Sequence, residues 1–526
     1  MSGGLVQYVS ALAPELLLTV GACAAILTGG RRAAPIALVT TLLALAATLA
    51  QLDGSTTPLP GLRFTSLTLY TRGIVLAIGA VLVLVNWHLP VAEERGEFFG
   101  MVLFSMAGVT LTSAANDLIV LFFAIELVSV PNYVLVALSS TDKRASEAAV
   151  KYFFLGAMSA ALMVYGFSFL YGVAGTTELF PAGGGGVAGY LSAGGWSNAY
   201  GLIGLLLAFA GLSFKIAAVP FHVYAPDVYQ GAASTVTGLL GFLPKMAGLV
   251  AMAILLLAAG WAESDRSLTL MWLLWIIAAA TMTVGNVLAL LQSNAKRMLA
   301  YSSIAHSGYM LVGLLVGPAA GEGPMGDGLA AMLFYIAVYG LMNLGAFTAL
   351  AAISVDGRPA EELTDLHGVS RSHPWAALAL AVCVFSLMGL PPTAGFLGKV
   401  YIFSSAFSLP DGDPFRGPMF ALGIIGVINA AIGAAYYLRI AAACYLPDAK
   451  TPPQPAGDRP LRYGLALCSL AMIVLFVWPW GLSRQAKMAT TTSHEASTIA
   501  QAQSSAPEVG IDPRPAGLKA EAATGR

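Results

Sequence analysis

The chain alternates between long apolar segments and short polar stretches over most of its 526 residues. A helix rises about 1.5 Å per residue, so roughly 20 consecutive apolar residues cross a bilayer core of about 30 Å. The pattern predicts an all-α integral membrane protein of about fourteen transmembrane helices. Their expected ranges are 8–28, 34–52, 66–88, 97–114, 117–138, 146–173, 199–222, 231–258, 269–291, 298–316, 328–353, 374–408, 417–439 and 462–481.

Composition agrees with a membrane environment and excludes several functional classes. The chain is 57% hydrophobic and only 10% charged, whereas a soluble domain carries about a quarter charged residues. A net charge of -1 gives no basic field for nucleic acid. The four cysteines show no metal-binding or disulfide spacing, so we expect no metal site and no cofactor in this chain. The GxGxxG match at 184–189 follows no strand and does not predict a dinucleotide site.

Lysine and arginine in the loops predict the orientation. With the N-terminus outside, 13 of them fall in cytoplasmic loops and three in outer loops, which is the bias typical of a bacterial plasma (inner) membrane protein. An even number of spans then returns the C-terminus to the outside. We expect a three-helix segment at 1–96, five-helix units at 97–258 and 269–445, a C-terminal helix at 446–483 and a disordered polar tail at 484–526.

Two of the expected spans contain proline where a helix cannot continue. The seventh includes Pro220 and Pro226, and the twelfth includes Pro391 and Pro392. Proline removes an amide donor and clashes with the preceding turn, so each span should break there and line a polar interior. The breaks are five helices apart, which predicts two inverted five-helix repeats, helices 4–8 and 9–13, with broken helices 7 and 12.

Few charged side chains fall inside the expected spans. A charge at mid-membrane costs at least about 2.5–3.5 kcal/mol, so several of them in one chain indicate a function. The cations are Arg72, Lys151, Lys215, Lys245 and Lys399, and the carboxylates are Glu15 and Glu126. Glu15 and Arg72 are expected at the membrane surface, with the Arg72 side chain extending outward to water.

The remaining residues suit the movement of protons. Burial favours the neutral form of lysine, and a nearby carboxylate favours the charged form. Moving the carboxylate towards or away from the lysine therefore makes the lysine bind or release a proton. Glu126 and Lys215 are the candidate switching pair, and Lys245 would pass the proton on. Lys399 would complete the route in the second repeat. His306 is the candidate relay between these two lysines, because histidine titrates in a useful range.

Other polar residues have plainer interpretations. His306 can equally be a packing donor. His222 and Lys151 are secondary relay candidates, and Lys151 can simply anchor its helix at the cytoplasmic interface. Lys296, together with its neighbour Arg297, is expected to be an ordinary cytoplasmic flank of a span.

Three segments resemble the antiporter-like membrane subunits of the respiratory NADH:quinone oxidoreductase, complex I: FKIAAVPFHVYAPDVYQGA, NAKRMLAYSSIAHSGYML and LPPTAGFLGKVYIF. The resemblance runs from about residue 97 to 445. Within that family, the lysine at 399 in GFLGK is similar to the subunit N branch, whereas the subunit M branch carries glutamate there. No long lateral helix like that of subunit L is recognisable near the C-terminus.

The resemblance implies a proton channel of four charged groups, which match Glu126, Lys215, Lys245 and Lys399. It also implies a place in the membrane arm beside subunits M and K and the lateral helix of subunit L, in contact with lipids. The flavin, the iron-sulfur clusters and the quinone site would lie on partner subunits.

Three other functions are compatible with the residues. A subunit of a multi-subunit cation/proton antiporter would share the fold and differ by requiring sodium. A solute permease would need a polar or aromatic pocket of substrate size at mid-membrane. In a structural scaffold, the buried lysines would serve only the packing of helices.

Overall fold

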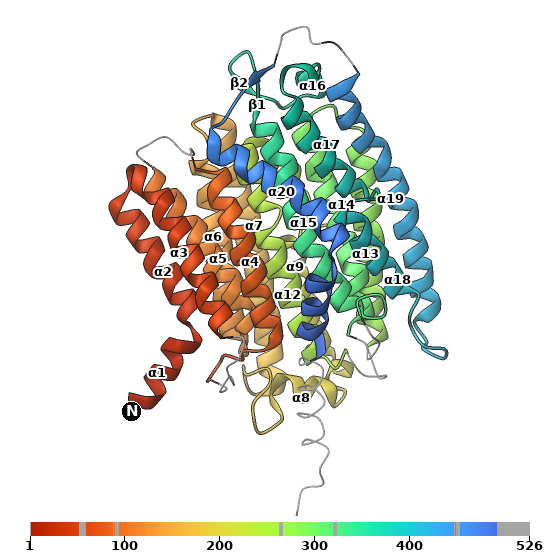
Figure 1. Cartoon of the computed structure of the whole chain (residues 1–526). Helices are drawn as coiled ribbons and strands as arrows, with labels where there is room; N and C mark the ends of the chain where they lie inside the picture. Colours follow the sequence, from red (N-terminus) through yellow and green to blue (C-terminus); the bar gives the residue numbers. More distant parts are fainter. Residues whose placement is uncertain are drawn as a thin grey trace, which may run out of the picture.

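The computed structural model describes residues 2–51, 59–87, 89, 94–261, 267–318, 323–446, 448 and 453–491. In this part of the chain the helices stand side by side in one bundle (Figure 1). Among the described residues, eleven helices are long and apolar enough to cross a membrane, and three shorter apolar helices accompany them at Ala13–Thr28, Ala199–Lys215 and Pro374–Met388. The prediction of an all-α integral membrane protein is confirmed. The count of fourteen spans and the inverted repeat stay predictions.

The N-terminal helices form one flank of the bundle, with the N-terminus at the lower end in Figure 1. They are α1 (Ser2–Ala11), α2 (Ala13–Thr28), η1 (Gly30–Arg32), α3 (Ala33–Ala50) and α4 (Ser66–Val85). Helix α4 packs against α5 and α20 and so joins this flank to the rest of the bundle.

The middle of the chain supplies the first broken helix. Its elements are α5 (Arg95–Ala114), α6 (Leu118–Leu138), α7 (Lys143–Ala174), α8 (Gly186–Ser192), η2 (Gly195–Ser197), α9 (Ala199–Lys215), α10 (Ala225–Gly231), α11 (Ser234–Leu240) and α12 (Leu243–Ala258). The expected seventh span, 199–222, covers α9 and the non-helical stretch that contains Pro220, and α10 follows it with Pro226 in its first turn. The expected eighth span is also in two pieces, α11 and α12, because Pro244 lies in the first turn of α12.

The last part of the chain supplies the second broken helix and a small sheet. Its elements are α13 (Leu268–Leu290), α14 (Ala295–Val316), α15 (Gly328–Ala351), β1 (Ile353–Val355), β2 (Arg358–Pro359), η3 (Leu363–Leu366), α16 (Val369–Ser372), α17 (Pro374–Met388), α18 (Ala394–Ala406), α19 (Arg416–Tyr445), β3 (Gln454–Pro455) and α20 (Arg459–Val477). Pro391 and Pro392 lie between α17 and α18. The strands pair antiparallel in the order β2-β1-β3 at the upper end of the bundle in Figure 1.

Burial separates central helices from peripheral ones. In α14 and α15, 94% of the apolar 18-residue stretch is buried inside the protein, against 28% of the corresponding stretch in α20. The central helices therefore meet other helices on every side, while the apolar outer faces of α7, α13, α19 and α20 are left to lipid. A charged side chain on a central helix must find its partners within the protein.

Side-chain caps start six of the described helices, five of which are long enough to cross a membrane. Each accepts a hydrogen bond from an amide of the first turn, which the helix itself cannot satisfy. The capping residues are Asp117, Asp142, Asn198, Ser267, Asn294 and Asp327. Because the caps are polar, they mark where each helix leaves the apolar layer.

The loop after β2 is held by one buried carboxylate. Arg358 donates two hydrogen bonds of 2.9 Å to Asp365, whose carboxylate also accepts from the amides of Glu361 and Glu362. Burial alone would raise the pKa of Asp365, but these hydrogen bonds outweigh it and hold the pKa of this carboxyl below its ordinary value. The loop therefore keeps Glu361 in a fixed place above α14.

The expected polar tail begins later than residue 484. Residues 480–491 are helical, and Lys487 and Thr490 donate hydrogen bonds of 2.7 and 2.8 Å to the buried carboxylate of Asp327. The Asp327 carboxylate thus accepts hydrogen bonds both from the first turn of its own helix, α15, and from the helix at 480–491. The rest of the expected tail, 492–526, lies outside the described residues.

The expectation for Arg72 and Glu15 is wrong. Arg72 is 1% exposed and does not reach water. Its guanidinium donates to both oxygens of Glu15, at 2.9 and 2.7 Å, and to the side chain of Gln51 at 2.8 Å. Since α2 and α4 pack on either side of α3, the two charges find each other across the flank instead of leaving the membrane.

We expect Arg72→Met to lower the free energy of unfolding by about 3–5 kcal/mol, because Glu15 is left buried without its cation. The double variant Arg72→Met/Glu15→Leu removes both charges and should recover most of the loss. Thermal unfolding of the purified protein in detergent measures both effects. Arg371→Met is the control, since its pair with Asp448 is exposed, and it should change stability by less than about 1 kcal/mol. An equal effect of the two single variants would contradict a stabilising role for the buried pair.

Candidate functional site

A buried ion pair joins α6 to the end of α9. The ammonium of Lys215, the last residue of α9, lies 3.0 Å from Glu126 Oε1 and donates at 2.8 Å to the hydroxyl of Ser129. Ser129 follows Glu126 by three residues, so both side chains lie on one face of α6. Lys215 is 5% exposed, whereas the Glu126 side chain is 20% exposed. The carboxylate therefore has more room to move than the lysine.

The break after α9 is closed by neighbouring groups. The amide of Val219 donates at 3.0 Å to the hydroxyl of Thr281 on α13, and the hydroxyl of Tyr224 donates at 2.9 Å to the carbonyl of Phe214. The break thus meets the requirement that backbone groups freed inside a membrane find partners in the protein. It also leaves Lys215 at the carbonyl end of a helix, where the helix dipole favours a cation.

One serine connects the break to the next lysine. The Ser307 hydroxyl donates at 2.5 Å to the carbonyl of Ile216, which directly follows Lys215, and accepts at 2.8 Å from the ammonium of Lys245. Lys245 lies in the first turn of α12, is 1% exposed, and also donates to the carbonyl of Ser303. Ser307 therefore holds the Lys245 ammonium against the backbone that directly follows Lys215, while the Lys215 ammonium itself contacts Glu126 and Ser129.

Hydroxyls and rings extend the site past Lys245. The Ser303 hydroxyl receives a hydrogen bond of 2.8 Å from Tyr339 and lies 3.3 Å from the hydroxyl of Tyr229. The ring of His306 is 5.0 Å from that of Tyr339, and its nitrogens are 2.6 Å from the Tyr335 hydroxyl and 2.8 Å from the Tyr437 hydroxyl. Both nitrogens of this buried histidine thus have a partner that can donate or accept a proton.

Lys399 lies at the second break. It is on α18, and its ammonium donates at 2.9 Å to the carbonyls of Leu387 and Met388, at the end of α17. It also lies 5.2 Å over the ring of Tyr309, which is 5.6 Å from His306. Carbonyls that the helix end leaves unpaired are therefore met by a lysine from the other half of the broken span.

We call this series the buried line: Glu126, Lys215, Ser307, Lys245, Ser303, Tyr339, His306, Tyr309 and Lys399. Hydrogen bonds and the peptide unit of Ile216 connect its members from Glu126 to Tyr339. Ring contacts alone continue it from Tyr339 to Lys399 in the described part of the chain. The five primary candidates from the sequence are thus brought together, although their roles stay predictions.

The two secondary candidates lie away from this line. Lys151 is on the surface of α7, where its ammonium lies 2.8 Å from Glu147 and 3.1 Å from Asp227. His222 lies in the first break, half-buried, and its Nδ1 has no hydrogen-bond partner among the described residues.

The sequence interpretation missed Lys296. It was expected to be a flank in water, but it is 3% exposed and donates to the carbonyls of Gln230 and Ala232 at 2.9 and 2.7 Å. Its ammonium is also 3.4 Å from Glu361. A lysine in the first turn of a central helix was the only available signal, because the loop that covers it comes from a distant part of the chain.

Comparisons with known proteins agree with this architecture. Residues 115–411 match the family described as NADH:quinone oxidoreductase/Mrp antiporter, TM. NADH-quinone oxidoreductase subunit N of Trichlorobacter lovleyi is 41% identical over 374 residues, which are 70% of this chain and 71% of that protein. Subunit N of Rhodospirillum rubrum is 37% identical over 412 residues, 77% of this chain and 79% of that protein.

Solved structures share the fold. A chain of respiratory complex I from Thermus thermophilus with bound aureothin superposes with a TM-score of 0.72 at 28% identity, covering 89% of this chain and 97% of that one. A chain of the Mrp complex from Dietzia gives a TM-score of 0.80 at 18% identity, covering 95% and 99%, which shows the fold alone.

The fold and the matched residues define an antiporter-like integral membrane protein. Within that class, the chain belongs to the NADH-quinone oxidoreductase subunit N family.

We expect Gly389→Ala to destabilise the protein more than Gly412→Ala does. Both glycines have a left-handed backbone, φ +86° and +97°, which costs an L-residue about 1–2 kcal/mol. Only at Gly389 would the new methyl group lie 2.9 Å from the Lys399 side chain, whereas it meets nothing within 4 Å at Gly412. Displacing Lys399 leaves two carbonyls unpaired, so thermal unfolding should show an additional loss of about 1–3 kcal/mol. Equal losses would mean that Lys399 does not hold the second break.

Proposed function

We propose that this chain carries protons across the bacterial plasma membrane as a subunit of a proton-translocating NADH:quinone oxidoreductase. The observation that carries the proposal is the buried ion pair of Glu126 and Lys215, with Lys245 held by Ser307 against the backbone next to Lys215 inside a membrane bundle. Structural packing alone would not require a series of titratable groups linked by hydroxyls, each of which can accept one proton and donate another.

The ion pair supplies the switch. At an effective dielectric constant of about 20, opposite charges 4 Å apart attract by about 4 kcal/mol. Withdrawing the Glu126 carboxylate from Lys215 would therefore change the proton affinity of the lysine by up to about a thousandfold. A lysine that has lost its counter-ion gives its proton to the next group along the buried line. Lys245 and then His306 and Lys399 are the successive acceptors in this proposal.

The energy for this transfer comes from other chains. We propose that this chain has no redox site and acts as the non-redox part of the translocase, with the flavin, iron-sulfur clusters and quinone site on partner subunits. Subunit names of the relatives and the multi-subunit complexes with the same fold support partners of this kind. The proposed neighbours are subunit M, subunit K and the lateral helix of subunit L. The proposed orientation has both termini outside, which makes the end that carries the β-sheet cytoplasmic.

Two substitutions at one position test the proposal. In inverted membrane vesicles with the assembled enzyme, Lys215→Ala should lower the number of protons taken up per NADH oxidised. Breaking a buried ion pair worth roughly 3 kcal/mol slows transfer through this chain by about a hundredfold. Lys215→Arg should keep the pair with Glu126 but stay protonated, so it should preserve assembly and still lose pumping.

Arg416→Ala is the matched control, because it lies at the start of α19, outside the buried line, and its pair with Asp411 is exposed. Its proton uptake should equal that of the unaltered enzyme. Normal pumping by Lys215→Ala would leave only a scaffold role for the lysine. Proton movement that requires sodium, rather than NADH oxidation, would favour a cation/proton antiporter.

A further inference from the structure

A cavity of about 800 Å³ lies beside the β-sheet, at the end that the proposed orientation makes cytoplasmic. Its rim consists of exposed residues, among them Asp142, Arg144 and Arg358. Its floor consists of buried residues from the α10–α11 junction and the start of α14, including Ser234, Thr235 and Lys296. The cavity therefore leads from the surface into the bundle.

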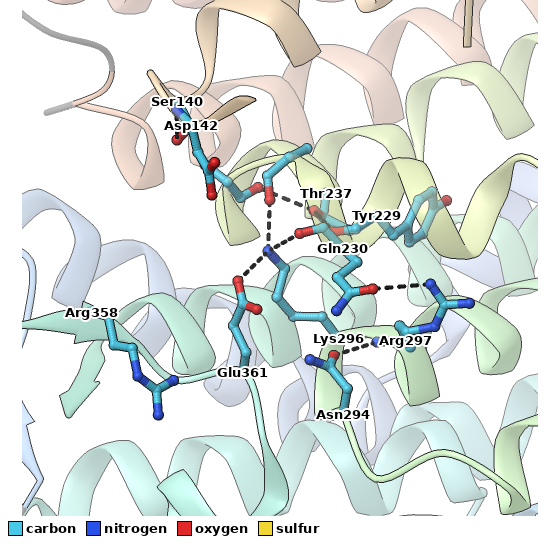
Figure 2. A network of polar contacts seen from close by, with 12 residues as sticks. Ser140, Asp142, Tyr229, Gln230, Thr237, Asn294, Lys296, Arg297, Arg358 and Glu361 are labelled. Carbon is cyan, nitrogen blue, oxygen red and sulfur yellow. Dashed lines mark hydrogen bonds and ion pairs between the residues drawn. The ribbon is translucent and has the colours of Figure 1, made fainter. Parts of the chain in front are cut away.

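Lys296 and Glu361 meet within this cavity. Figure 2 shows the Lys296 ammonium directed at the Glu361 carboxylate on one side and at the α10–α11 junction on the other. The amide of Ala295 donates at 2.6 Å to the carbonyl of Glu361, which fixes the acidic residue at the start of α14. The Glu361 side chain is 26% exposed and that of Lys296 is 4% exposed, so the carboxylate faces the opening and the lysine lies behind it.

The floor of the cavity carries two buried hydroxyls. The Ser234 Oγ and the Thr235 Oγ1 have no hydrogen-bond partner among the described residues, although these residues are 5% and 2% exposed. Buried polar groups of this kind are normally satisfied, and water is the usual partner in a polar cavity of sufficient size. Two adjacent unsatisfied hydroxyls at the floor therefore indicate that water occupies it.

The cavity and the buried line meet at two consecutive residues of α10, Gln230 and Tyr229. Gln230 lines the cavity and accepts a hydrogen bond from Arg297 (Figure 2). The hydroxyl of its neighbour Tyr229 lies 3.3 Å from that of Ser303. The carbonyl of Ser303 holds the ammonium of Lys245. Helix α10 thus contacts Lys296 through the carbonyl of Gln230 in its last turn, and contacts Ser303 of the buried line through the hydroxyl of Tyr229.

The charges around the opening are mixed in sign. Besides Lys296 and Glu361, the lining residues with charged side chains are Asp142, Arg144, Arg358, Glu362 and Asp458. Because the lining carries both positive and negative side chains, its electrostatic potential attracts neither anions nor cations selectively. Such a lining is compatible with water as the occupant.

We propose that this cavity is the aqueous entrance through which protons reach Lys245, and that the Lys296–Glu361 ion pair is the gate that limits water at its floor. The inference rests on the proposed function for the identity of the cargo. When the pair is closed, the lysine stem fills the passage between α10, α11 and α14. When Glu361 releases Lys296, water reaches Ser234 and Thr235 and extends towards Tyr229 and Ser303.

Accessibility of a thiol at the floor tests the entrance. In vesicles with the assembled enzyme, Thr235→Cys should react with a membrane-impermeant, positively charged methanethiosulfonate added to the cytoplasmic face. In combination with Glu361→Gln, which keeps the size of the side chain and removes its charge, the reaction should be about tenfold faster. Modification should also lower proton uptake per NADH oxidised. Ser234→Cys replaces Thr235→Cys if the latter fails to assemble.

Thr348→Cys is the matched control. Thr348 is also a buried threonine whose hydroxyl finds no partner in the described part of the chain, but it does not line this cavity, so a thiol at position 348 should stay unreactive in both backgrounds. Equal reactivity of positions 235 and 348, reaction only from the outer face, or full pumping after modification would each overturn the entrance. An unchanged rate with Glu361→Gln would overturn the gate.

The labelling readout separates this inference from the proposed function. Modification at position 235 is measured as mass added to the chain and does not depend on NADH oxidation. If the unaltered enzyme moved no protons while the thiol still reacted through the gate, the proposed function would fail and the water-filled cavity would stand. If the thiol were unreactive in an enzyme that pumps protons, the water-filled cavity would fail and the proposed function would stand.

Discussion

A membrane interior tolerates a charge or an unpaired carbonyl only when another polar group meets it, and the centre of this protein is built on that constraint. Each broken helix leaves carbonyls that need donors, and each buried lysine needs acceptors. Lys399 meets both needs at the second break, where it binds the carbonyls that end α17. Lys215 ends α9 and takes its acceptors from α6. The breaks and the lysines therefore stabilise one another.

The same constraint explains why serine and tyrosine fill the space between the charges. A hydroxyl can donate and accept at once, so Ser307 satisfies a carbonyl at the first break and the ammonium of Lys245 together. Tyr335 and Tyr437 each supply one hydroxyl partner to a nitrogen of His306. The contacts between two hydroxyls, or between a hydroxyl and the His306 ring, can also exchange donor and acceptor without a large movement of helices.

Two ion pairs show where reasoning from the linear sequence stops. Arg72 and Lys296 both lie within a few residues of a helix start, where a long cation ordinarily reaches water. In the structure Arg72 is covered by the N-terminal flank, and Lys296 is covered by the loop that Arg358 and Asp365 hold over α14. Their partners, Glu15 and Glu361, are 57 and 65 residues away. Spacing along one helix carries no information about such partners.

The sequence by itself determined the membrane class, the approximate spans, the positions of both breaks and the titratable residues, because hydropathy, proline and charge act locally. It could not determine that Glu126 faces Lys215, that Ser307 bridges Ile216 and Lys245, or that residues 484–491 continue a helix. Those outcomes depend on which helix faces meet, and apolar faces alone fit together in many ways. Tertiary packing decided them, because each buried polar group has few positions in which all of its hydrogen bonds are satisfied.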